Sequence, residues 1–292
     1  MPGPSTRFVL LVLAVSCSRA ADVHLASTDP VDRTATDAST GETTEFDAAR
    51  DAREGAAQLL PLPSQPLFTN LAVPGFPEAV VSVPNGATSP RPVLIVLHGS
   101  GDRPDYNCDA WRHISGAFGF VLCPRGDFDP LDSTKGDLRY TLSGGPRLRA
   151  HVDAALDALA ARYAGYVDVE RPMVAGFSLG ATQIAQLAIR WPDRFPRVAL
   201  VEGGHDVWTE SAIHSFAVTG THRVLFGCGS TWSLAPARAA AARLVKDGVE
   251  ARVVHANVGH TTDRPLQEAI MAEIDWFFEG DTRWASAFRS AR

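Results

Sequence analysis

The sequence predicts an α/β protein with a doubly wound, mostly parallel sheet that is flanked by helices. Short apolar runs alternate along the chain with segments of helical character, and turn-forming glycine and proline residues separate them. Each run is apolar at consecutive positions, as expected of strands that helices cover on both faces. The runs lie at 93–97, 119–122, 172–176, 198–201, 223–226 and 252–255.

Two shorter strands, at 67–73 and 78–83, precede these runs and are predicted to form an opening hairpin. The segment 125–145 is predicted to be a loop. About twenty residues join the runs at 198–201 and 223–226, which leaves room for one helix and for no large cap domain. Apolar spacing and helix-breaking residues predict helices at 146–163, 179–190, 235–246 and 265–278.

The N-terminus has the features of an export signal. Arg7 precedes an apolar run at 8–15, which is too short to span a bilayer. Ser18-Arg19-Ala20 fits an ordinary cleavage site, whereas Ala14-Val15-Ser16-Cys17 resembles a lipobox in which Cys17 would carry lipid. We expect an exported, membrane-anchored lipoprotein of the periplasm or cell surface. Simple secretion, or a cytoplasmic protein with an apolar extension, are the alternatives.

The acidic charge is confined to one stretch. Residues 21–60 carry nine acidic side chains and three arginines, which accounts for the whole net charge of −6. The remainder is neutral, so no electrostatic footprint predicts a nucleic-acid partner. The predicted organisation is a signal at 1–20, a disordered acidic linker at 21–60, a folded domain at 61–280 and a C-terminal tail at 281–292. We expect a monomer.

The strongest chemical signal is Gly176-Phe177-Ser178-Leu179-Gly180. This G-x-S-x-G pattern follows a predicted strand and opens a predicted helix. A sharp turn of this kind strains the serine backbone, and the two glycines let neighbouring chain approach closely. The hydroxyl is then exposed at the carboxyl edge of the sheet, above a helix N-terminus. Ser178 is therefore the predicted nucleophile, and an ordinary turn rich in small residues is the alternative.

Two further motifs end predicted strands at the same edge. The glycine-rich loop His98-Gly99-Ser100-Gly101 can aim the N–H of Ser100 at the space above Ser178, where it would form an oxyanion hole with the N–H of Leu179. His98 itself is predicted to be structural. The second motif, Val258-Gly259-His260-Thr261, lies between the last strand and the closing helix. His260 is therefore the predicted general base.

From about residue 65 to residue 279 the sequence resembles the α/β-hydrolase family. The resemblance lies in His98-Gly99, the elbow at Ser178 and the terminal His260, which occur in the family's order. It implies hydrolysis of a small-molecule ester through an acyl-enzyme, with no cofactor and no metal. It does not identify the substrate, because this fold hosts many.

The sequence departs from the family at the acid of the triad. That acid usually lies in a G-x-x-D pattern after the strand at 223–226, where this chain has Gly229-Ser230-Thr231-Trp232. Some members take the acid from the end of the preceding strand, which here is Glu202. We predict Glu202 because an unpaired carboxylate at the end of a buried strand is costly, with Asp206 as the second candidate. A merely structural pairing of Glu202 with an arginine is the alternative.

Three functions remain open at this stage. The first is a carboxylesterase or thioesterase-like hydrolase. The second is a serine peptidase of the prolyl-oligopeptidase kind, although the region before residue 60 is too short for a propeller. The third is a non-catalytic surface or binding protein, which Trp232 in place of the acid would favour. Trp208 and Trp232 follow strands at the carboxyl edge and are expected to line the substrate cleft or to pack beneath it.

A disulfide between Cys108 and Cys123 is also predicted. Cys108 is placed just before a helix that leaves the carboxyl edge, and Cys123 ends a strand that returns to it. An exported protein permits such a bridge. Cys228 lies further across the predicted sheet and is left as a free thiol.

Overall fold

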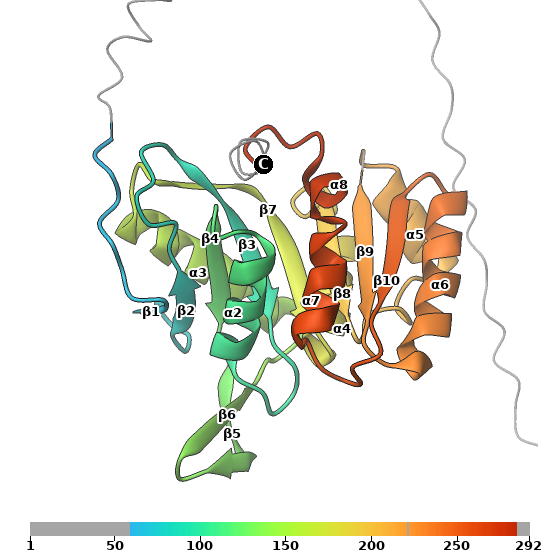
Figure 1. Ribbon diagram of the computed structural model, residues 1–292, viewed down its shortest axis with the longest axis horizontal. Helices are drawn as coiled ribbons and strands as arrows, with labels where there is room; N and C mark the ends of the chain where they lie inside the picture. Colours follow the sequence, from blue (N-terminus) through green and yellow to red (C-terminus); the bar gives the residue numbers. More distant parts are fainter. Residues whose placement is uncertain (1–58, 221, 285–292) are drawn as a thin grey trace, which may run out of the picture. The chain divides into compact units, whose positions relative to one another are not determined.

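The computed structural model describes residues 59–220 and 222–284. Its centre is an eight-stranded sheet in the order β1-β2-β4-β3-β7-β8-β9-β10 (Figure 1). β1 and β2 form an antiparallel hairpin, β2 runs antiparallel to β4, and the strands from β4 to β10 in that order are parallel. The strands are β1 (Thr69–Leu71), β2 (Ala79–Ser82), β3 (Arg91–Leu97), β4 (Phe120–Pro124), β7 (Val167–Phe177), β8 (Arg197–Val201), β9 (Arg223–Cys228) and β10 (Glu250–His255).

Helices cover both faces of this sheet. One apolar cluster joins a sheet face to side chains of α3, α4, α5 and α6, and a second joins the other face to α2, α7 and α8. Within β3, Ile95 belongs to the first cluster and Leu94 to the second, so both faces of the strand are buried. The helices are α2 (Pro104–Ile114), α3 (Gly145–Arg162), α4 (Leu179–Arg190), α5 (Glu210–Ala217), α6 (Thr231–Lys246), α7 (Arg264–Met271) and α8 (Ile274–Phe278).

The predicted fold class is thus confirmed, but two segments differ from expectation. The predicted loop at 125–145 contains a hairpin, β5 (Asp127–Thr134) and β6 (Asp137–Thr141), whose strands are mostly polar and partly exposed. Backbone hydrogen bonds between Asp102 and Tyr140 join it to the loop after β3. The expected helix at 265–278 is interrupted and forms α7 and α8.

The C-terminal boundary also differs. The tail was expected to begin at 281, but Trp284 is fully buried and stacks on Phe278 with ring centroids 4.3 Å apart. The folded part therefore extends at least to Trp284. The predicted signal, Cys17 and almost all of the predicted linker lie outside the described residues. Among the helices of the described part, none has the length and apolar character that crossing a membrane requires.

Candidate active site

The elbow between β7 and α4 holds Ser178 in an unusual backbone conformation, with φ of 52° and ψ of −118°. The neighbouring glycines permit this turn because their α-carbons meet other backbone closely. A Cβ on Gly176 would lie 2.4 Å from the carbonyl oxygen of Gly180. A Cβ on Gly180 would lie 2.4 Å from the carbonyl oxygen of His98. The strained serine is thereby fixed at the carboxyl edge of the sheet.

Ser178, His260 and Glu202 form a continuous hydrogen-bonded chain. The Oγ of Ser178 lies 2.9 Å from Nε2 of His260, and Nδ1 of His260 lies 3.0 Å from Oε2 of Glu202. Glu202 follows β8 with a positive φ of 55°. The next residue, Gly203, passes so close to the elbow that a Cβ there would lie 2.5 Å from the carbonyl oxygen of Ser178. The ends of β7 and β8 therefore pack closely, and this places the carboxylate of Glu202 beside His260.

The carboxylate of Glu202 is fully buried and accepts hydrogen bonds from the start of α6. Its Oε1 accepts from the backbone N–H groups of Gly229, at 2.6 Å, and Ser230, at 3.0 Å. The hydroxyl of Ser233 donates to the same oxygen at 2.6 Å, and the hydroxyl of Ser230 donates to Oε2. Ser230 and Ser233 were not predicted to belong to the site. Both precede the helix predicted at 235–246, and it is the observed start of α6 at Thr231 that places them, three positions apart, on one face.

This environment keeps Glu202 ionised. Burial alone would raise its pKa, but the hydrogen bonds from Ser230, Ser233 and His260 outweigh burial, and the pKa is lowered. An ionised carboxylate only accepts hydrogen bonds, so Nδ1 of His260 carries the proton that it donates to Glu202. In the neutral imidazole Nε2 is then unprotonated, and it can accept the hydroxyl proton of Ser178. The arrangement has the protonation pattern that a general base requires.

A cleft of about 590 Å³ opens above this chain. Gly99 lines this cleft and lies beside the elbow. A Cβ on Gly99 would lie 3.4 Å from the Cβ of Ser178. Ser100 also lines the cleft, and Leu179 is the first residue of α4, where backbone N–H groups have no acceptor within the helix. His98 is buried, and its ring nitrogens lie 2.7 Å and 2.8 Å from the carbonyl oxygens of Gly99 and Arg125. Its position is structural.

Of the remaining candidate residues, Trp232 lies at the site, whereas Trp208 and Asp206 do not take part in it. Trp232 is exposed and its ring lies 5.7 Å from that of His260, so it borders the site. The expectation that Trp208 could line the cleft is wrong, because Trp208 is 1% exposed and packs against Phe216 of α5. Asp206 is exposed, and among the described residues the hydrogen-bond partner of Nδ1 of His260 is Glu202.

The cysteines lie away from the cleft. Cys108 and Cys123 form a disulfide that joins α2 to β4, and Cys228 is a buried free thiol. The sequence predicted that Cys108 lies just before this helix. The helix begins earlier, at Pro104, so Cys108 lies within α2. Burial raises the pKa of Cys228 to about 11. No cluster of three or more metal-ligating side chains occurs within 59–220 and 222–284.

No family model and no curated protein sequence matches this chain. Solved structures do match its fold. An S-formylglutathione hydrolase from Staphylococcus aureus matches with a TM-score of 0.54 at 13% identity, over 75% of this chain and 99% of that one. A fluorophosphonate-binding serine hydrolase of the same organism matches with a TM-score of 0.52 at 14% identity, over 74% and 98% of the two chains.

A thermostable esterase matches with a TM-score of 0.51 at 18% identity, over 73% of this chain. The match spans 62% of that esterase, which is less than two thirds of its length. Together with the sheet order and the elbow at Ser178, these likenesses show that the described part of the chain has the α/β-hydrolase fold.

Proposed function

We propose that this chain is a serine hydrolase that cleaves a carboxylic ester or thioester of a small molecule through an acyl-enzyme on Ser178. The observation that carries the proposal is the continuous chain from Ser178 through His260 to Glu202, with successive distances of 2.9 and 3.0 Å. Nucleophile, base and orienting acid within hydrogen-bond reach are the signature of an activated serine.

The reaction begins when Oγ of Ser178 attacks the carbonyl carbon and Nε2 of His260 takes the hydroxyl proton. The N–H groups of Ser100 and Leu179 stabilise the negative oxygen of the tetrahedral intermediate, and Glu202 stabilises the imidazolium. His260 returns the proton to the departing alcohol or thiol, which leaves Ser178 acylated. Water then attacks the acyl group with His260 again as base, releasing the acid and restoring the serine.

Two observations support this function. Between β8 and β9 the described residues form α5 and connecting loops, and no further helix or strand among them. The structures with similar folds include an esterase and serine hydrolases, which agrees with this class of reaction. Trp232 and the loop at Gly99 and Ser100 are the side chains and backbone that we expect to contact the acyl or alcohol group.

The proposal is tested by steady-state hydrolysis of nitrophenyl esters with acyl chains of increasing length. The wild type is expected to turn over at least one ester, and Ser178→Ala should lower kcat by at least about 10⁴-fold. Ser211→Ala is the matched control, because Ser211 is exposed on α5 and should leave kcat unchanged. Equal rates in Ser178→Ala and the control would contradict the proposal. No turnover by the wild type of any ester would favour a non-catalytic binding protein.

A further inference from the structure

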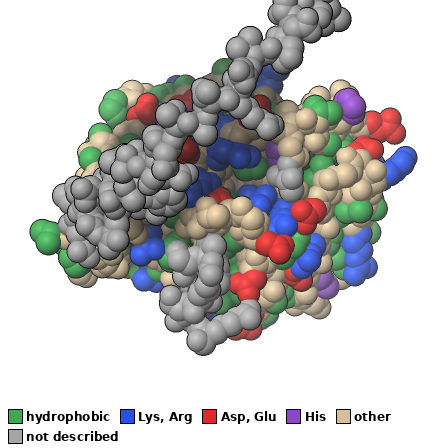
Figure 2. Space-filling model, turned by 90° about the horizontal axis from the view of Figure 1, so that it is seen from above, with side chains coloured by type: hydrophobic (Ala, Val, Ile, Leu, Met, Phe, Trp, Pro, Cys, Tyr) green, Lys and Arg blue, Asp and Glu red, His purple; other side chains and the backbone are tan. Residues whose placement is uncertain are grey.

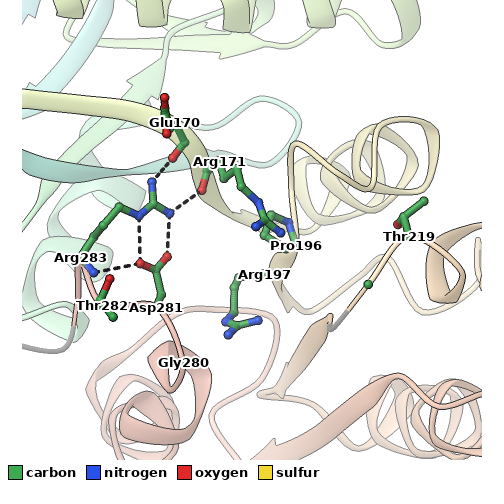
Figure 3. Close-up of a pocket in the computed structure, with 10 residues that line it drawn as sticks. Glu170, Arg171, Pro196, Arg197, Thr219, Gly280, Asp281, Thr282 and Arg283 are labelled. Atoms are coloured by element: carbon green, nitrogen blue, oxygen red, sulfur yellow. Dashed lines mark hydrogen bonds and ion pairs between the residues drawn. The ribbon is translucent and has the colours of Figure 1, made fainter. Parts of the chain in front are cut away.

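A second pocket lies at the opposite end of the sheet from Ser178. It has a volume of about 490 Å³ and is formed by the first half of β7, the start of β8, the loop after α5 and the segment after α8 (Figure 3). Figure 2 looks onto this end of the molecule, where Lys and Arg side chains lie within a hollow. The charged residues that line the pocket are Glu170, Arg171, Arg197, Asp281 and Arg283.

Arg197 is the unusual member of this group. It is only 8% exposed, and one of its terminal nitrogens donates to the carbonyl oxygen of Glu279 at 2.6 Å. Its Nε has no partner among the described residues, and no carboxylate of that part of the chain forms an ion pair with it. Burial lowers its pKa and the positive charges of Arg223 and Arg171 add to the lowering, while the more distant carboxylates of Asp281 and Glu250 oppose it. A buried guanidinium without a counter-ion is costly.

The neighbouring arginines already have their counter-ions. Arg283 forms an ion pair with Asp281 and lies 3.6 Å from Asp168. Arg223 pairs with Glu250 and Glu279. The carboxylate of Asp281 is therefore engaged with Arg283; it acts on Arg197 at longer range and forms no ion pair with it.

Arg171 adds a second positive charge through an irregular stretch of β7. The pairing of β7 with β3 shifts register between Asp168 and Met173, so Arg171 lies in a bulge. Its φ of 44° is in the left-handed region, which is unfavourable for a residue with a Cβ. Bulges redirect side chains, and Figure 3 shows Arg171 directed toward the same side of the pocket as Arg197, with the carboxylate of Glu170 directed elsewhere. No ion pair of Arg171 occurs within the described residues.

We propose that this pocket binds the phosphate group of a small soluble molecule, with Arg171 and Arg197 as its principal contacts. A guanidinium presents its N–H groups as a planar fork that matches phosphate oxygens, and two that form no ion pair among the described residues line this pocket. The volume of about 490 Å³ exceeds that of a phosphate ion and leaves room for the rest of the molecule. The site is separate from the ester cleft because the two occupy opposite ends of β7.

Inorganic phosphate is the probe for the first test. Calorimetric titration at constant ionic strength, with chloride as the competing anion, should show saturable binding to the wild type. Arg171→Gln and Arg197→Gln should each weaken that binding about tenfold or more, since each removes a charged hydrogen-bonding group. Arg243→Gln, an exposed substitution on α6, is the control and should bind as the wild type does.

Two results would overturn the proposal. One is no saturable heat from phosphate with the wild type. The other is wild-type affinity for phosphate in Arg171→Gln. Because the Arg171 side chain is exposed, we expect this variant to fold, so it tests the pocket even if Arg197→Gln does not fold.

Discussion

Replacement of Glu202 by glutamine isolates the role of the buried carboxylate. Its Oε1 accepts from the backbone N–H groups of Gly229 and Ser230, which cannot reverse direction, so the glutamine oxygen must occupy that position. The glutamine NH₂ then faces Nδ1 of His260 in place of Oε2. Since that nitrogen must now accept, the ring proton moves to Nε2, which can no longer take the proton of Ser178.

The expected loss follows from this change of tautomer. In serine proteases the equivalent amide substitution lowers kcat about 10⁴-fold while the geometry is preserved. That ratio corresponds to about 5.5 kcal/mol of lost transition-state stabilisation. We therefore expect Glu202→Gln to fold and to lose about 10⁴-fold in kcat with an activated ester. The measurement combines steady-state kinetics with thermal unfolding of the same samples.

The matched control is Asp206→Asn. Asp206 is exposed four residues further along the chain, and its amide variant should lose less than about tenfold in kcat. A folded Glu202→Gln enzyme within tenfold of the wild type would refute the assignment of Glu202. The opposite pattern, with the large loss in Asp206→Asn, would move the acid to Asp206.

Further predictions concern stability and the anchor. Reducing the Cys108–Cys123 bridge, which spans 15 positions, should cost about 3 kcal/mol in urea unfolding, and an unchanged midpoint would contradict this. Cys228 should resist iodoacetamide until the protein unfolds, because burial raises its pKa to about 11; equal labelling of native and unfolded protein would argue otherwise. Burial lowers the pKa of His222 to about 4, so its stabilising contribution is full above an unfolded pKa of about 6.5 and disappears toward pH 4. His222→Gln should therefore flatten the fall in unfolding free energy between these pH values, whereas a retained slope would count against it. We propose that Cys17 carries lipid: wild-type protein expressed with its signal should partition into detergent and Cys17→Ala should not, and aqueous behaviour of both would leave simple secretion.

The elbow, the histidine and the acid were accessible to sequence reasoning because each follows a strand that the sequence predicts. In a parallel sheet the carboxyl ends of strands meet at one edge, so Ser178, Glu202 and His260 could be brought together from chain order alone. Because no carboxylate follows β9 before Asp247, the end of β8 was the expected source of the acid.

The parts that were missed depend on contacts rather than on local pattern. The β5–β6 hairpin is mostly polar, with Leu131 93% exposed, so no alternation of buried positions marked its strands. Trp208 follows a strand like a cleft residue, but its burial is decided by packing on α5. The serines that hold Glu202 become recognisable only when the start of α6 is known to lie beside β8.

The most direct test of the central claim is covalent labelling by a fluorophosphonate, followed by mass spectrometry of the modified peptide. An activated serine should displace the fluoride and retain the phosphonyl group on Ser178 in the wild type. His260→Ala should label far more slowly, because the hydroxyl proton then has no acceptor. We expect one adduct per chain, located on Ser178. An adduct on another residue, or undiminished labelling of His260→Ala, would contradict it.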